Sequence, residues 1–477
     1  MDLKHRIRFA ACRAVFRYAL IVLAACLPLA CRAFDISYWV WERASPLSQA
    51  EIAGLRAQKV TVLYWNIGEI SNAGADWKWK TAPAPPRQAV DGLTIIPVVR
   101  ITSIGKSPFD PPSLGALVAR LRPVAAGGAL QIDFDCPDRL LGAYAQALKT
   151  IHAAVPKLTI TALAGWSRRP EWGDVQAGVD GIFPMFYDLG PEPGPAQGGP
   201  VPLADVKTTA DRIASWSGCK IPWMAGIPSF GRLSLYDVDG RWLGNIRQWG
   251  WDDVCFNICL ISEKPTAPGM VLFQVRSDGI VSTTPVKKGQ LIVARLPARE
   301  ALAAASASAQ KAGAQGVIYF RLPDGGDPSG WSLRQMAGLT AQPAPKLELR
   351  EQTPGRLTLV NNSDTDLEPR LSSGDNIAGK NAATGMDRGY ALEIDADAPI
   401  FREATPGDFW KVTGHANPDS KPALVAIPLA TRLTFWFSHL RAGESLDCGL
   451  IQLAPNTTFK QIRWRVIQLG ETWQPVK

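Results

Sequence analysis

The chain has 477 residues, 46% hydrophobic and 20% charged, so it can bury a large core and is long enough for more than one domain. Its formal net charge of +8 is concentrated at the amino terminus, where the first 33 residues carry six Lys or Arg against one Asp. The remaining 45 basic and 42 acidic residues form no basic run, so the charge gives no case for a nucleic-acid or other polyanion partner.

The first 33 residues have the pattern of a secretory signal: a basic start, then an apolar run from Tyr18 to Ala30 that is too short to span a bilayer. We therefore expect an exported protein, either periplasmic or anchored to the membrane as a lipoprotein. Leu23-Ala24-Ala25-Cys26 fits the segment before a lipidated cysteine, and Cys31-Arg32-Ala33 offers small residues for ordinary signal peptidase. A third interpretation is that Cys26 falls in the apolar run by chance.

From residue 34 to about 340, short β-rich runs alternate with helix-compatible stretches, a pattern typical of a parallel sheet with helices outside it. Eight such units close into an α/β fold of the (β/α)8 TIM-barrel type. The expected strands are Asp35 to Trp41, Val60 to Asn66, Leu93 to Ile101, Leu130 to Asp135, Leu158 to Trp166, Gly181 to Tyr187, Ile221 to Ile227, and Gly316 to Arg321.

Two segments depart from this alternation. Residues 232–297 separate the seventh strand from its helix and contain the hairpin signal Asp237-Val238-Asp239-Gly240. Their length predicts an inserted subdomain that overhangs the barrel mouth. After Gln342-Pro343-Ala344-Pro345, a linker by composition, β-type runs take over, so residues 346–477 are expected to form a C-terminal, sandwich-like β-domain.

The cysteines and histidines predict neither a disulfide framework nor a metal site. Cys255 and Cys259 could pair or lie one helical turn apart, and we expect the five cysteines beyond the signal to serve packing. His152, His415 and His439 are far from one another and from the cysteine pair, so a zinc site is not expected. No glycine-rich nucleotide or dinucleotide motif is present, and the predicted chemistry needs no cofactor.

The strongest catalytic signal is a pair of aspartates on the fourth strand. Asp133 and Asp135 are two residues apart, so their side chains share one face of the strand and point together into the barrel end. Like charges this close separate the two pKa values, and one carboxyl can stay protonated while the other is ionised, as glycoside cleavage requires. Alternatively, the pair caps strand and helix ends or binds a cation.

Other polar and aromatic residues fall near the same strand ends. Met185, Tyr187 and Asp188 close the sixth strand, and the Tyr187 hydroxyl could bond a reacting oxygen. Arg100 ends the third strand and could hold an anionic group or pair with an aspartate. Flat apolar faces of sugar rings stack on aromatic side chains. We expect contacts of this kind from Trp41, Trp65, Trp166 and Phe320.

The pattern resembles family 18 glycoside hydrolases, the chitinase-like barrels. In their motif D-G-x-D-x-D-x-E, Asp133 stands at the last aspartate, while Asp135 replaces the acid glutamate and Gln131 replaces the preceding aspartate. Met185, Tyr187 and Asp188 match the M-x-Y-D segment, and Phe320 lies where a tryptophan is usual. The resemblance implies that Asp133 steadies the cation formed when an acetamido group attacks, and that Tyr187 bonds the acetamido oxygen.

A closer resemblance, over residues 34 to about 340, is to a bacterial family catalogued as domain of unknown function 3142. It is carried by Tyr38 to Trp41, Gln131 to Asp135 and Thr161 to Trp166. This resemblance implies the barrel fold.

Two functions are expected from these residues. The first is an exported glycoside-hydrolase-like enzyme that acts on a polysaccharide or amino-sugar glycan. The second is a carbohydrate-binding or scaffold protein that keeps the cleft without catalysis, because an acid on Asp135 would sit roughly 1.5 Å further from the glycosidic oxygen than one on Glu. A weaker third is a polymer-assembly lipoprotein whose C-terminal domain contacts a partner at the membrane.

Overall fold

The structure is a computed structural model. The predicted signal segment with Cys26, and part of the predicted linker, lie outside the described residues. Among the described helices, none is both long and apolar enough to cross a membrane. The described residues are 34–43, 45–72, 76–84, 90–103, 108–189, 202–267, 269–323, 330–339, 344–369, 388–416, 423–470 and 472–477.

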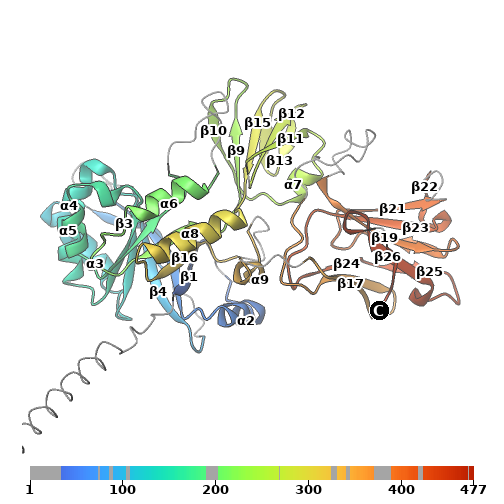
Figure 1. The fold of residues 1–477 in the computed structure, drawn as a ribbon, viewed down its shortest axis with the longest axis horizontal. Helices are drawn as coiled ribbons and strands as arrows, with labels where there is room; N and C mark the ends of the chain where they lie inside the picture. Colours follow the sequence, from blue (N-terminus) through green and yellow to red (C-terminus); the bar gives the residue numbers. More distant parts are fainter. Residues whose placement is uncertain are drawn as a thin grey trace, which may run out of the picture. The chain divides into compact units, whose positions relative to one another are not determined.

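Eight parallel strands form a closed barrel, as predicted (Figure 1). The ring closes because the first strand pairs with both the second and the last. A ninth strand, β3 (Trp77–Thr81), joins the second strand in antiparallel orientation. The barrel strands are β1 (Asp35–Val40), β2 (Val62–Asn72), β4 (Thr94–Ser103), β5 (Leu130–Asp133), β6 (Leu158–Leu163), β7 (Gly181–Met185), β8 (Met224–Pro228) and β16 (Gly316–Phe320).

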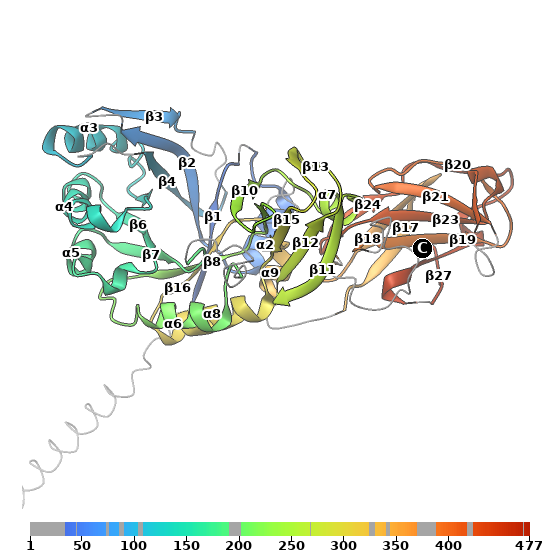
Figure 2. The same ribbon diagram turned by 90° about the horizontal axis from the view of Figure 1, so that it is seen from above.

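Helices follow most of these strands and cover the outside of the ring (Figure 2). In α4, Tyr144, Leu148 and Ile151 are buried at helical spacing, which gives an apolar stripe toward the sheet. The inside of the ring is filled by side chains that include Trp39, Tyr64 and Phe183. The helices are α2 (Gln49–Ala57), α3 (Pro111–Leu121), α4 (Leu141–His152), α5 (Trp172–Ala177), α6 (Val206–Ala214), α8 (Arg299–Lys311) and α9 (Leu333–Ala337).

The predicted insertion after the seventh strand is a small antiparallel unit with its own core. Its sheet has the order β10-β9-β15-β12-β11, and Phe273 and Ile292 are among its fully buried residues. The predicted hairpin turn lies at Asp237–Gly240, where the Gly240 N–H donates to the Asp237 carbonyl at 3.0 Å. The elements are β9 (Arg232–Tyr236), β10 (Trp242–Ile246), α7 (Asp252–Cys255), β11 (Leu260–Ala267), β12 (Met270–Val275), β13 (Gly279–Val281), β14 (Thr284–Val286) and β15 (Leu291–Arg295).

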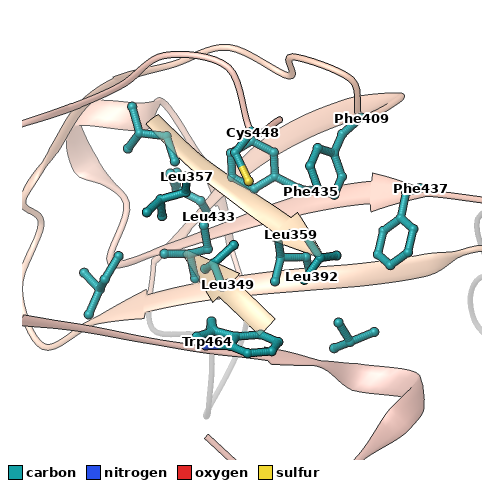
Figure 3. Packing of buried hydrophobic residues seen from close by; sticks show 14 of the residues in the cluster. Leu349, Leu357, Leu359, Leu392, Phe409, Leu433, Phe435, Phe437, Cys448 and Trp464 are labelled. Carbon is teal, nitrogen blue, oxygen red and sulfur yellow. The ribbon is translucent and has the colours of Figure 1, made fainter. Parts of the chain in front are cut away.

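The C-terminal region is all-β, as predicted. A three-stranded sheet, β17-β18-β24, and a six-stranded sheet, β22-β21-β23-β19-β26-β27, enclose a core in which Leu359 lies near Leu392 and Phe435 (Figure 3). The strands are β17 (Leu347–Thr353), β18 (Arg356–Asn361), β19 (Tyr390–Ala396), β20 (Phe401–Ala404), β21 (Lys411–Ala416), β22 (Ala423–Val425), β23 (Arg432–Phe437), β24 (Ser445–Asp447), β25 (Ile451–Leu453), β26 (Ile462–Val466) and β27 (Gln474–Pro475).

This β-rich region is hydrogen-bonded to the segment around α9. The buried Asp366 carboxylate accepts from the backbone N–H of Ser332 and from that of Ala442, both at 2.8 Å. The Gln335 amide donates to the Glu368 carboxylate at 2.6 Å. These contacts satisfy polar groups that burial would otherwise leave without water.

Candidate active site

A cavity of about 560 Å³ opens where the barrel strands end. Eight of the ten residues predicted for the site line it, and four of them, Asp133, Asp135, Tyr187 and Asp188, carry groups able to exchange or share a proton. This is the end of a barrel at which binding sites are usually built. The full lining is Trp39, Trp41, Arg100, Asp133, Asp135, Thr161, Leu163, Ala164, Gly165, Met185, Tyr187, Asp188, Leu189, Arg212, Phe230, Arg232 and Phe320.

The structure does not bring Trp65 or Trp166 to this cavity. Trp65 follows Tyr64 in β2, and because Tyr64 points into the barrel, strand alternation turns Trp65 to the outer face. The fifth strand was expected to run to Trp166, but β6 ends at Leu163 and Trp166 begins a 3-10 turn. There Trp166 is only 1% exposed and meets the Tyr144 ring edge-on, so its role is packing.

The two aspartates point into the cavity as predicted, but their surroundings differ. Between them, Phe134 turns outward and packs edge-on against Tyr144, with ring centres 5.1 Å apart. Asp133 is 8% exposed and accepts a hydrogen bond from the Thr161 hydroxyl at 2.8 Å. Asp135 is exposed at the rim. One carboxylate is therefore held by the protein, and the other is accessible to a ligand.

Both carboxyls hold their protons more strongly than aspartates in water. Burial raises the pKa of Asp133 to about 6, and the neighbouring Asp135 charge adds to this, while Thr161 and Arg100 oppose it. Although part of the Asp135 side chain is exposed, the cavity walls around its carboxyl limit hydration and so raise its pKa as well; Arg100 lowers this pKa and Asp188 raises it. Because the two groups interact, they titrate as a pair. As the pH rises, this pair loses its last proton only near pH 6.

Arg100 pairs with carboxylates, one of the two roles predicted for it. Its Nε lies 3.5 Å from Asp133 Oδ2, and its Nη1 lies 3.8 Å from Glu69 Oε1. The guanidinium also lies over the Trp41 ring, 5.9 Å from the ring centre. This placement favours the ionised form of Asp133 from one side of the cavity.

Tyr187 lies among aromatic rings below the rim. It stacks on Phe320 with ring centres 5.7 Å apart and meets Phe230 edge-on at 6.0 Å. Burial, together with the charge of Asp133, raises the pKa of Tyr187 well above its usual value. The hydroxyl therefore stays protonated and can donate a hydrogen bond into the cavity.

Asp188 forms a two-point ion pair with Arg232 from the start of the insertion. The two guanidinium nitrogens lie 2.5 and 2.6 Å from the two carboxylate oxygens. The same guanidinium lies over the Phe230 ring at 5.4 Å. Asp188 also has a left-handed backbone, with φ of 52°. This pair ties the insertion to the wall of the cavity that follows β7, the sixth barrel strand.

Trp39 and Phe320 form an aromatic floor that the neighbouring strands keep in place. The Trp39 indole donates to the Gln131 side-chain oxygen at 2.6 Å, so Gln131 serves this floor and not the acid chemistry. Gly226 on β8 leaves room for Trp39, because a Cβ there would lie 2.8 Å from Trp39 Cη2. Phe320 meets Trp39 edge-on at 6.1 Å.

Among the described residues, no cluster of three or more His, Cys, Asp or Glu is arranged to hold a metal ion.

Comparisons with known proteins show no family match: no family model and no curated protein matches the chain. Solved structures similar to it include the spore cortex-lytic enzyme SleL of Bacillus cereus, with 16% identity over 60% of this chain and 70% of that one and a TM-score of 0.39. A family 18 N-acetylglucosaminidase from Paenibacillus barengoltzii has 15% identity over 62% of this chain and 96% of that one, with a TM-score of 0.38.

A family 18 chitinase from Chromobacterium violaceum has 12% identity over 93% of this chain and 91% of that one, with a TM-score of 0.36. At TM-scores below 0.5, these similarities establish neither a family nor an activity for this chain. The barrel itself follows from the chain's own strand pairing, and the relation to domain of unknown function 3142 stays a prediction.

Nine of the 17 residues that line the cavity were not predicted as site residues, and four of these bear most on its chemistry: Thr161, Arg212, Phe230 and Arg232. One of them could have been found from strand pairing. Ile132 pairs with Ile160, so the next residues, Asp133 and Thr161, are neighbours on the same inner face. The other three follow the barrel strands in the chain, and no strand periodicity marks them.

Proposed function

We propose that this protein is a glycoside hydrolase that acts on a polysaccharide or amino-sugar glycan at the barrel mouth. The observation that carries the proposal is the aspartate pair, two carboxyls with raised pKa values at the end of β5, beside a floor of aromatic rings. Paired carboxyls supply the proton donor and the charge stabiliser that cleavage of a glycosidic bond needs. The aromatic floor offers faces on which sugar rings stack.

In the proposed reaction the aspartate pair carries one proton, and the form that reacts has this proton on Asp135, whose carboxyl is exposed to the cavity, and has Asp133 ionised. Because burial raises the pKa of Asp133 to about 6, this form is the minor one of the singly protonated pair. Asp135 gives its proton to the glycosidic oxygen as the bond from that oxygen to the anomeric carbon breaks. The acetamido oxygen of the substrate attacks the same carbon, ionised Asp133 steadies the positive charge that develops, and the Tyr187 hydroxyl donates to the acetamido oxygen. Water then opens the intermediate and returns a proton to Asp135.

The proposal is tested with purified protein, soluble oligosaccharides of N-acetylglucosamine and a panel of neutral and acidic polysaccharides, by measuring release of reducing ends. We expect Asp135→Asn to lower the rate on the responsive glycan by about 100-fold or more, because an amide cannot give the proton. The matched control is Asp138→Asn, which changes an exposed aspartate outside the cavity lining. Equal turnover by Asp135→Asn and the wild type would reject the assignment.

Gln131 favours a second candidate, a carbohydrate-binding protein without catalysis. This residue replaces a titratable aspartate of the family 18 motif and is bound to Trp39 at 2.6 Å. The Asp135 side chain is also shorter than the motif glutamate, so its carboxyl lies further from the glycosidic oxygen. In this second candidate function, the cleft binds sugar without cleaving it. Calorimetric binding of a glycan with no product release, unchanged by Asp135→Asn, would identify this function.

We also propose that the protein is exported and that its lipid anchor is Cys26. The proposal rests on the basic and apolar start of the chain. Labelling with a fatty-acid analogue in a bacterial host tests it: the wild type should carry label and fractionate with membranes, and Cys26→Ala should lose both. Mature protein that begins just after Ala33 would instead identify ordinary signal peptidase.

A further inference from the structure

Arg212 is a cavity residue that the proposed reaction does not use. It comes from α6, whose buried residues Thr209 and Ile213 face the protein interior, and α6 lies beside α8 (Figure 1). The end of this helix is fixed to the fifth-strand wall of the cavity. The Trp216 indole donates to the Ala164 carbonyl at 3.0 Å, and the Ser215 hydroxyl lies 3.0 Å from that of Ser167.

Because Ala164 and Gly165 themselves line the cavity, this attachment brings the Arg212 side chain into the lining beside them. Arg212 itself lies in helix α6, and the turn that ends this helix is hydrogen-bonded to the turn that follows β6. A charged group held on such a frame can recognise a ligand group at a defined place.

None of the described acidic residues that line the cavity forms an ion pair with Arg212. Of the other two arginines, Arg100 lies 3.5 Å from Asp133, and Arg232 is bound at two points by Asp188. Within the described part of the chain, Arg212 has no ion pair or side-chain hydrogen bond, and the exposed Asp135 has none either. Among the described residues, the cavity therefore presents one carboxyl, Asp135, and one guanidinium, Arg212, that form no ion pair with each other or with another residue.

We propose that Arg212 binds an anionic substituent of the glycan, so that the substrate class is an acidic glycan whose sugar carries a carboxylate or sulfate group. This inference rests on the proposed function of the same cavity. An uncharged sugar would leave the guanidinium without a counter-charge. A carboxylate or sulfate would instead accept two charge-assisted hydrogen bonds from the two parallel N–H donors of the planar guanidinium. The bound glycan would lie between the two groups, with its scissile bond at Asp135 and its anion at Arg212.

Binding is measured by calorimetry in the Asp135→Asn background, so that the result does not depend on turnover. The probes are a trisaccharide of N-acetylglucosamine, the same trisaccharide with a lactyl-ether carboxylate on one ring, and its 6-O-sulfated form. We expect one of the two anionic probes to bind roughly 10- to 100-fold more tightly than the neutral one. This preference should shrink as salt rises, and the tighter probe identifies the anion.

Arg212→Gln should remove the preference and leave affinity for the neutral trisaccharide unchanged. The matched control is Lys207→Gln, which removes an exposed cation from the same helix outside the cavity lining. Arg212→Lys keeps a charge but loses the fork, so it should bind the preferred anion several-fold more weakly than Arg. If Arg212→Gln does not fold, Arg212→Lys is used as the test. The inference is then overturned if Arg212→Lys binds the preferred anionic probe as tightly as the protein with Arg212 does.

Equal affinity of all three probes for the protein with Arg212 would also overturn the inference. In that case, hydrolysis of the neutral trisaccharide by the wild type would still support the proposed function. The proposed function can also fail while the inference holds. Tight, Arg212-dependent binding of an anionic probe with no hydrolysis by the wild type would support Arg212 and reject the enzyme.

Discussion

Asp133 is kept at the barrel mouth at a cost to stability. Its pKa of about 6 exceeds that of an aspartate in an unfolded chain, about 3.9, so the folded protein binds the proton more strongly. Stability linked to this group is therefore fully present below about pH 4 and is lost as the pH rises through about 6. At neutral pH the ionised carboxylate opposes folding.

We accordingly predict that Asp133→Asn stabilises the protein while removing its activity. The amide keeps the shape and an acceptor for Thr161 but carries no buried charge, so the free energy of unfolding at pH 7 should rise by about 2–3 kcal/mol. Urea unfolding at pH 7 and pH 4.5 measures this. The gain should be much smaller at pH 4.5, and a gain of equal size at both pH values would contradict the linkage to Asp133.

The Thr161 hydroxyl tunes the same group. It donates to ionised Asp133 at 2.8 Å and so lowers the pKa of that carboxyl. In Thr161→Val the pKa should rise, by about one unit. Because the proposed reaction needs Asp133 ionised and the proton on Asp135, the reactive form should become about tenfold scarcer, so the maximum of kcat/KM should fall by about tenfold and its alkaline limb should move to higher pH by about one unit. Thr159→Val, the same change on the same face of β6, should leave the limb in place.

At the scale of elements, the eight strands could be predicted because they are short apolar runs and most of them are followed by a helix-compatible segment. The aspartate pair could be predicted because alternation in one strand fixes both side chains. The antiparallel strand β3 could not be predicted, because it pairs with the second half of β2. Strand β2 continues to Asn72, whereas we expected it to end at Asn66. The burial of Trp166 was missed because β6 ends at Leu163, and no local signal marks that end.

The cavity floor depends on β8 having no side chain at Gly226. A Cβ there would lie 2.8 Å from Trp39 Cη2 and 3.0 Å from the Pro184 carbonyl oxygen. Gly226→Ala should therefore lower the free energy of unfolding by about 1–3 kcal/mol and weaken ligand binding by displacing Trp39. Urea unfolding and calorimetry measure the two effects.

Gly173→Ala is the matched control for that change. A Cβ at Gly173 in α5 meets nothing within 4 Å, and alanine favours a helix over glycine by up to about 1 kcal/mol. This variant should be as stable as the wild type or slightly more so. Similar destabilisation by both alanines would show that the contact with Trp39 is not the cause.

At the scale of the whole molecule, the described part of the chain beyond the signal should unfold in one step. The Asp366 carboxylate bonds backbone N–H groups at Ser332 and Ala442, which lie on opposite sides of the predicted linker. A stack between Phe256 and Trp410, with ring centres 4.5 Å apart, joins the insertion to the C-terminal β-region. Tryptophan fluorescence and circular dichroism should therefore give coincident transitions.

Asp366→Ala should weaken this coupling. It leaves two buried N–H donors without an acceptor, each costing about 1–3 kcal/mol, and should lower the melting temperature or separate the transitions. Asp364→Ala, an exposed position two residues earlier, should do neither. A cooperative melt unchanged by Asp366→Ala would mean that the two regions are stable without this bond.

The ring of strands is completed by its two ends, since β1 lies hydrogen-bonded next to β16. A chain emerging from a ribosome or a translocation channel holds its first strand with one edge unpaired until nearly three hundred more residues have followed. Closure is thus a late, long-range event in folding, which slows it and leaves time for the edge to meet other chains. This protein therefore benefits if its incompletely folded form is kept from aggregating until the last strand is available to pair.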